Sequence, residues 1–461
     1  MPDFDPRSHP VPAPPVELSS PRSIHRRSPA LPLLLLLLAS PALALQPLAD
    51  FLKGARQSNL DQAIAALTVA QQEGESLAAL GRTLPTFSAR GTYTRNQFES
   101  KIDASQFLPP GTPTGGEEAE LVIQPLNQLD ASLQLDAPVL DAASWARLSA
   151  QRANERAARH RADATLLDVE KQVARSYYQL VGAEALHRSA QRSLDAAQAN
   201  LELTRTRRQG GVATELDVNR ATAEAERARQ SISDAELTAE LARRALLTLT
   251  GVRPQGEVTA PEDDLRQEAP LESFLQGGGA GLPAVSAAQE QRRSAEAAAL
   301  ASQLQLLPSV TASANQRFTN ATGFTGNNSL YVLTGNLHWQ LDLTTFGTMR
   351  AQSAAAEVAR LREQSARQAA LDQIHEAWFR VHNGIAKSRA ARAAATSAQA
   401  AVSRARERSQ QGAGTQLELI QAERDAFSAE VSRLQADADL SYARAALRLQ
   451  AGHLLDEETN R

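Results

Sequence analysis

Several segments of the chain alternate apolar and polar residues with the period of two that a β-strand imposes. Every odd position from Leu129 to Val139 is apolar, and the even positions from Gln128 to Asp136 are polar. The same alternation is found in residues 87–94, 310–314 and 331–343. These segments approach the roughly 9–11 residues of a tilted membrane strand. A soluble sheet packed on a core would give the same pattern, so the period alone does not decide between the two.

The remaining pattern is helical and very long. Residues 144–209 and 348–411 contain no proline, and each stretch would form a rod roughly 100 Å long at 1.5 Å per residue. Each is followed, after a glycine turn, by a second helical stretch, over residues 216–250 and 417–451. Leucines at near-heptad spacing predict coiled-coil seams; they are Leu194, Leu201, Leu203, Leu237, Leu241 and Leu246. A tube or bridge needs such rods, whereas a compact domain does not.

The sequence repeats one plan twice. The turn that begins at Gly211 corresponds to the turn at Gly412, and Leu140-Asp141 corresponds to Leu341-Asp342 at the same offset of 201 residues. Upstream, Leu84-Pro85 corresponds to Leu307-Pro308 at a larger offset. The difference is 22 extra residues, in a Pro- and Gly-rich stretch around Leu108 to Glu118 that we expect to be a loop. The predicted division is a first repeat over 45–251, a linker over 252–283, a second repeat over 284–451 and a tail over 452–461.

The N-terminus has the features of an export signal. A basic stretch ending at Arg27 precedes six consecutive leucines, Leu33 to Leu38, and the small-x-small site Ala42-Leu43-Ala44 follows. This order predicts a secretory signal peptide over residues 1–44, with the mature chain beginning at Leu45. The apolar run is interrupted by prolines and is shorter than the ~20 residues that a membrane-spanning helix needs.

Composition argues against catalysis and against nucleic-acid binding. The chain has no cysteine, which excludes disulfides, thiolate metal sites and a lipidated N-terminal cysteine. Its formal net charge of -4 gives no reason to expect a nucleic-acid partner. His375 and His382 share a helix face, but no third ligand lies at helical spacing. We find no phosphate-binding glycine loop and no nucleophile elbow. We therefore expect no enzyme activity, no cofactor and no bound metal.

The two glycine turns resemble those of the TolC-like outer-membrane efflux protein family. The most specific match is Gly211 to Val218, followed by Asn219-Arg220-Ala221, and Gly412 to Glu418 matches more loosely. The Leu-Pro pairs at Leu84 and Leu307 resemble the helix-to-strand junctions of the family. The resemblance implies an α+β membrane protein: a trimeric, twelve-stranded β-barrel with four strands per protomer that continues into a long periplasmic α-helical coiled-coil tunnel. Independently of it, four strands cannot enclose a water-filled lumen, so several chains are required.

The same resemblance implies a location in the outer membrane, contact with outer-membrane lipid and a role as exit duct for efflux or type I secretion. It also implies an inner-membrane pump and a periplasmic adaptor (membrane fusion) protein as partners. Glu418 and Asp217 are the candidate acids of a pore gate, although each is also an ordinary helix-start acid. We expect the adaptor to dock at the two turns; the residues concerned are Gly211, Val212, Ala213, Thr214, Gly412, Ala413, Gly414 and Thr415.

Two alternative classes remain at this point. A periplasmic coiled-coil adaptor is also secreted, but it is expected to have one helical hairpin flanked by soluble β-domains. A secreted structural coiled coil should lack the alternating strands. The exported substrate is not fixed by the fold.

Overall fold

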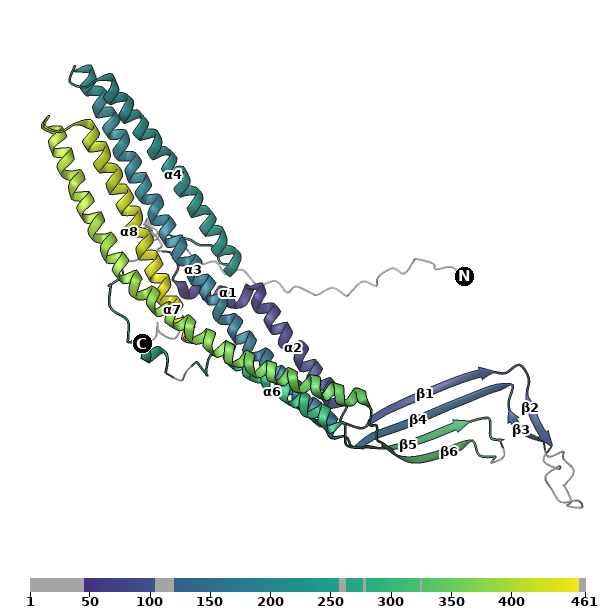
Figure 1. Ribbon diagram of the computed structural model, residues 1–461. Helices are drawn as coiled ribbons and strands as arrows, with labels where there is room; N and C mark the ends of the chain where they lie inside the picture. The colour runs from purple at the N-terminus through teal and green to yellow at the C-terminus, as the bar shows by residue number, and fades with distance from the viewer. Residues whose placement is uncertain (1–44, 104–119, 257–262, 277–278, 324–325, 456–461) are drawn as a thin grey trace, which may run out of the picture. The chain divides into compact units, whose positions relative to one another are not determined.

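The computed structural model describes residues 45–103, 120–256, 263–276, 279–323 and 326–455. The predicted signal peptide, residues 1–44, lies outside the described residues. The elements in chain order are α1 Leu48–Ser58, α2 Leu60–Gly81, β1 Thr86–Arg95, β2 Ser100–Asp103, β3 Glu120–Gln124, β4 Asn127–Leu140, α3 Ala142–Gln209, α4 Glu215–Thr250, α5 Leu271–Phe274, α6 Pro283–Leu304, β5 Ser309–Thr319, β6 Ser329–His338, α7 Leu343–Gln410 and α8 Gln416–Gln450 (Figure 1).

Four strands form one antiparallel sheet in the order β1-β4-β5-β6. The central pair places Gln134 of β4 opposite Asn315 of β5, and β1 and β6 form the two edges. Neither edge strand has a second partner within the described chain. All four strands coincide with segments that the alternation predicted.

The exposure along most of β4 is the reverse of that in a strand of a soluble protein. Along β4 the apolar positions are exposed, including 58% of Leu129, and the polar positions between them are partly covered. The polar face is bonded across strands, with Arg317 paired to Asp130 at 2.6 Å. On β6, Leu333 is 74% exposed. Among the described residues, the apolar face of the sheet is therefore covered by no other element of this chain.

A second, two-stranded sheet pairs β2 with β3 and was not predicted. These strands have 4 and 5 residues, too few for a period of two to be recognised. They flank the expected loop, and residues 108–118 of that loop lie outside the described residues.

The two longest helices, α3 and α7, have 68 residues each, roughly 100 Å at 1.5 Å per residue. Asp141 caps α3 by accepting from the Ser144 N–H at 3.0 Å, and Asp342 caps α7 by accepting from the Thr345 N–H at 2.7 Å. The prediction that strand alternation runs to residue 343 was wrong. The strand β6 ends at His338, because the Asp342 cap starts the helix at Leu343.

The helices pack side by side through small residues, with α3 against α4 and α8, and α7 against α8. Leu194, Leu201 and Leu246 are buried as predicted. The three other leucines, Leu203, Leu237 and Leu241, are 44%, 59% and 62% exposed in the single chain, so they form no seam within it.

One face of this helical layer is covered by α1 and by the segment between α4 and α6. Phe51 of α1 packs on Val173 of α3, and the Trp378 indole N–H of α7 donates to the Ala269 carbonyl at 2.9 Å. Arg444 of α8 pairs with Asp263 at 2.7 Å. The predicted linker thus contains α5 and is bonded to the helices.

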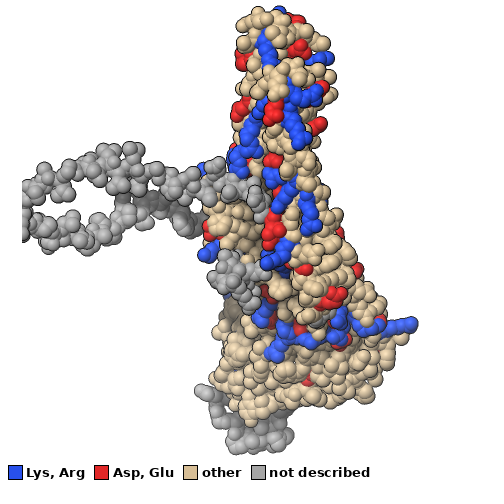
Figure 2. Space-filling model, turned by 90° about the vertical axis from the view of Figure 1, so that its left-hand side faces the viewer, with Lys and Arg blue, Asp and Glu red and all other residues tan. Residues whose placement is uncertain are grey.

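Acidic and basic side chains both occur along the helices, and α3 and α7 each carry more basic than acidic residues. Figure 2 shows acidic and basic side chains interspersed along the helices on one face, whereas the lower part, where the strands lie, carries few. No helix among the described residues is both long and apolar enough to cross a membrane.

Candidate gate and docking site at the helical turns

The turns α3–α4 and α7–α8 share one hydrogen-bonding scheme. The Val212 N–H donates to the Arg207 carbonyl at 2.8 Å, and the Ala413 N–H donates to the Arg408 carbonyl at 2.9 Å. Each turn passes through a glycine with positive φ, 76° at Gly211 and 73° at Gly412. A side chain is strained in that conformation, which explains the glycine at both positions.

A threonine caps the helix that leaves each turn. The Asp217 N–H donates to the Thr214 hydroxyl at 3.2 Å, and the Glu418 N–H donates to the Thr415 hydroxyl at the same distance. In the first turn the bond is reciprocal, since the Thr214 N–H donates to the Asp217 carboxylate at 3.0 Å. The Thr214 hydroxyl and N–H both hold the pKa of Asp217 below its usual value. The Asp217 carboxylate is therefore already engaged by the cap.

The Glu418 carboxylate is less engaged by its helix cap than the Asp217 carboxylate is. Its side chain is about half exposed and its nearest base is Arg408 of the same hairpin, at 4.0 Å. The next two residues, Leu419 and Ile420, are buried and fix this start of α8 against the neighbouring helices. Of the two acids predicted for a gate, Glu418 has the carboxylate that can face an ion.

The tips present a small and mostly apolar surface. Val212 is 81% exposed, and Ala413 is exposed at the equivalent position. Gly414 is partly covered, and a Cβ there would lie 3.1 Å from the Arg408 Cβ. Both turns lie at the same end of the helical layer (Figure 1). Because α3 starts directly after β4, this end is about 100 Å of helix away from the sheet.

Side-chain contacts that the sequence alone did not predict join the two hairpins near the tips. Arg207 donates to the Ser409 carbonyl at 3.1 Å, and Gln416 donates to the Asn200 amide oxygen at 2.8 Å. Further along, the Arg424 Nε is 2.7 Å from the Glu224 carboxylate. The sequence did contain a signal for these contacts. Because the two halves repeat with an offset of 201 residues, equivalent positions lie at the same height along the helices, and opposite charges about 200 residues apart can pair.

Among the described residues, no group of three or more histidine and acidic side chains is placed to hold a metal ion. His382, one of the two helical histidines, stacks on Trp378 with the ring centroids 5.4 Å apart. Burial raises the pKa of Glu423, which pairs with Arg406 at 3.2 Å.

The comparisons with known proteins agree with this architecture. The family model described as outer membrane efflux protein matches residues 51–252 and 280–453, most of the chain, so the chain belongs to the outer membrane efflux protein family. No curated protein matches the sequence.

Solved structures give the same fold at low identity. The outer-membrane channel OprN aligns with a TM-score of 0.73 and 21% identity over 88% of this chain and 90% of its own. The Campylobacter jejuni CmeC outer membrane channel aligns with a TM-score of 0.75 and 17% identity, over 88% of this chain and 86% of its own. The open state of the Neisseria gonorrhoeae MtrE outer membrane channel aligns with a TM-score of 0.72 and 19% identity, over 89% of this chain and 90% of its own.

The chain is thus an outer membrane efflux protein, and its fold is that of solved outer-membrane channels. The predicted family resemblance, function and location are confirmed, and the adaptor and structural coiled-coil alternatives are disfavoured. The family is one of transport channels and not of enzymes.

Proposed function

We propose that three copies of this chain close one barrel in the outer membrane and one helical tunnel below it, and that this duct carries substrate out of the cell. An inner-membrane pump supplies the substrate, and a periplasmic adaptor joins the pump to the two turns. The observation that carries the proposal is the sheet, with an exposed apolar face and two unpaired edges in one chain.

Lipid provides the reason for closure between chains. An unpaired strand edge leaves backbone N–H and C=O groups without partners, and in a bilayer core each costs several kcal/mol. If β1 of one chain pairs with β6 of the next all around the ring, no strand edge is left unpaired. The exposed leucines of β4 and β6 then face lipid, and the bonded polar face, with Asp130 and Arg317, faces the lumen.

The gate is proposed at the tip of the tunnel. Three copies of Glu418 form an acidic ring, and acidic rings favour cations. Arg408 of each chain lies 4.0 Å from the Glu418 carboxylate, and its positive charge reduces the negative potential of the ring. The contacts Arg424–Glu224 and Arg207–Ser409 hold the two hairpins of a chain together and so restrict the opening. Asp217 stays a gate candidate, with its carboxylate shared with the Thr214 cap.

Planar bilayers test the duct and the gate together. The purified protein is expected to conduct ions with a preference for cations, and Glu418→Gln is expected to lower that preference. Arg408→Gln, which removes the nearby base, should raise it.

Glu224→Gln loosens the contact between hairpins and provides a variant that conducts more. If neither the wild type nor Glu224→Gln conducted, the proposed duct would be wrong; unchanged selectivity in Glu418→Gln would leave Glu418 as a helix-start acid.

A further inference from the structure

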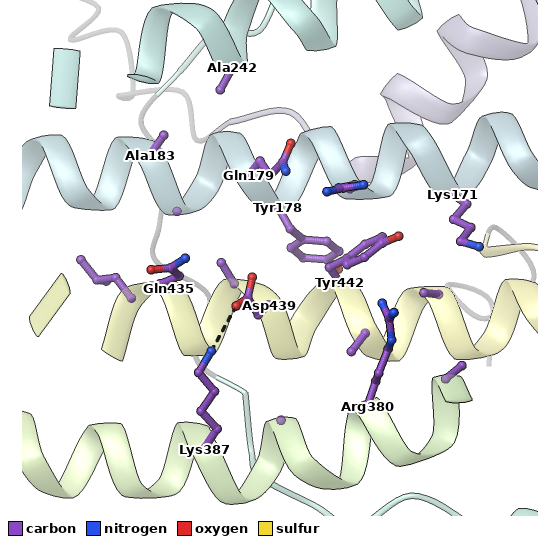
Figure 3. Close-up of a pocket in the computed structure, with 18 of the residues that line it drawn as sticks. Lys171, Tyr178, Gln179, Ala183, Ala242, Arg380, Lys387, Gln435, Asp439 and Tyr442 are labelled. Atoms are coloured by element: carbon purple, nitrogen blue, oxygen red, sulfur yellow. Dashed lines mark ion pairs between the residues drawn. The ribbon is translucent and has the colours of Figure 1, made fainter. Parts of the chain in front are cut away.

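A large groove crosses the helical layer midway between the strands and the turns. It has a volume of about 1150 Å³ and is lined by residues of α3, α4, α7 and α8. Figure 3 shows the groove with Tyr178 and Lys171 on α3, Tyr442 and Asp439 on α8, and Arg380 on α7. None of these residues belongs to the gate or docking site described above.

The groove lies on the face opposite to the one that α1 and the linker cover. On α7, Trp378 bonds to the linker and Arg380 lines the groove. On α8, Arg444 bonds to the linker and Tyr442 lines the groove. Residues two apart on a helix point about 200° apart, so each helix presents one residue to each face. In the proposed duct we assign the covered face to the outside and the groove face to the path of the substrate.

The charges in the groove are unbalanced. Four bases and two acids line it: Lys171, Arg175, Arg380, Lys387, Glu376 and Asp439. Arg380 pairs with Glu376 at 2.6 Å, and Lys387 pairs with Asp439 at 3.5 Å. The Lys171 ammonium meets only the neutral amide oxygen of Gln450, at 2.9 Å when that amide is oriented to accept. No carboxylate of the described residues pairs with Lys171 or Arg175, which leaves two positive charges available to an anion.

The rest of the lining is apolar or aromatic. The Tyr178 and Tyr442 rings lie next to each other between α3 and α8, and Arg380 points toward them (Figure 3). Leu186, Leu241 and Val431 complete the wall. An aromatic wall beside uncompensated basic groups suits a ligand that has a flat apolar body and one negative group, because ring contacts and charge-assisted hydrogen bonds are then made together.

We propose that this groove is a binding station for amphipathic organic anions, in which Lys171 and Arg175 hold the anionic group and Tyr178 and Tyr442 hold the apolar body. The inference rests on the proposed function in one respect, namely that this face lines the duct. It assigns the duct a preferred substrate class, organic anions that have an aromatic or aliphatic body.

Equilibrium dialysis of the purified full-length protein in a nonionic detergent tests the proposal, with protein-free detergent as the blank. The probes are naphthalene-2-sulfonate and naphthalen-2-ylmethylammonium, which share one ring system and differ in the sign of charge. The anion is expected to bind at least about tenfold more tightly than the cation, because two bases lack carboxylate partners. Equal binding of the two probes, or no binding, would overturn the proposal.

Variants locate the site. Lys171→Gln with Arg175→Gln is expected to weaken binding of the anion about tenfold, and Glu376→Gln is expected to strengthen it. The matched control is Arg360→Gln with Arg362→Gln, which removes two exposed bases of α7 outside the groove. If the control weakened binding as much as the groove variant, general charge and not the groove would attract the probe, and the proposal would fail.

The outcome is separable from that of the proposed function. The groove is built from four helices of one chain, so binding is measurable whether or not the chains assemble. Native mass spectrometry of the same samples reports the assembly. A trimer that binds both probes equally would contradict the binding station alone. A monomer that binds the anion selectively would contradict the proposed duct and support the binding site.

Discussion

The substitution Leu333→Arg is expected to remove most assembled protein from the outer membrane. Leu333 lies in the middle of β6 and is 74% exposed on the apolar face of the sheet. Placing an arginine on the lipid face of a barrel costs about 2–4 kcal/mol near the bilayer midplane. Three copies would carry that cost together. The measurement is the amount of heat-modifiable oligomer recovered from outer membranes, and we expect at least a tenfold loss.

The adjacent residue supplies the control. Thr334 lies on the opposite face of the same strand and pairs with Ser313, so Thr334→Arg puts the same side chain toward the proposed lumen. That variant should assemble at close to the wild-type level. Equal recovery of the two variants, whether high or low, would contradict the assignment of the apolar face to lipid.

Bulky residues at the turns are expected to abolish export while leaving the channel assembled. Ala413→Trp, together with Val212→Trp, enlarges the small surface that we propose as the adaptor dock. These positions are preferred to Thr214 and Thr415, because the threonines cap α4 and α8 and their loss typically costs about 1 kcal/mol. Export by the complete system should fall to the level of a strain without the channel.

Cross-linking separates docking from a general defect. The natural chain has no cysteine, so single cysteines are unambiguous. A cysteine at Val212 or Ala413 should cross-link in cells to a cysteine at the tip of the cognate adaptor. A cysteine at exposed Asp234, further along α4, should not. Intact export in the tryptophan variant, with no cross-link at either tip, would remove the docking site and leave the channel itself in place.

The sequence predicted the elements whose signals are local. Alternation identified the four strands of the sheet, and the absence of proline identified the long helices. Errors arose where two local signals competed: Leu343 continues the apolar row of β6, yet the Asp342 cap places it in α7. Leu237 fits a heptad spacing but faces away from its own hairpin, since spacing does not say which of two faces meets a neighbour.

The candidate site was predictable only in part, for a similar reason. The glycines and threonines of the turns follow from local backbone geometry, so their positions could be predicted from the sequence alone. The contacts Arg424–Glu224 and Gln416–Asn200, and the groove beside Tyr178, depend on how helices from the two halves pack. Arg175 and Tyr442 each resemble any other helix residue until the fold brings them to one face.

Native mass spectrometry of the detergent-purified protein tests whether the chains close one barrel together, the step on which barrel, tunnel and gate all depend. We expect a trimer of the mature chain, stable in micelles, in which the four-stranded sheets pair edge to edge. A correctly folded monomer that remains stable in the same micelles, with β1 and β6 unpaired, would contradict it.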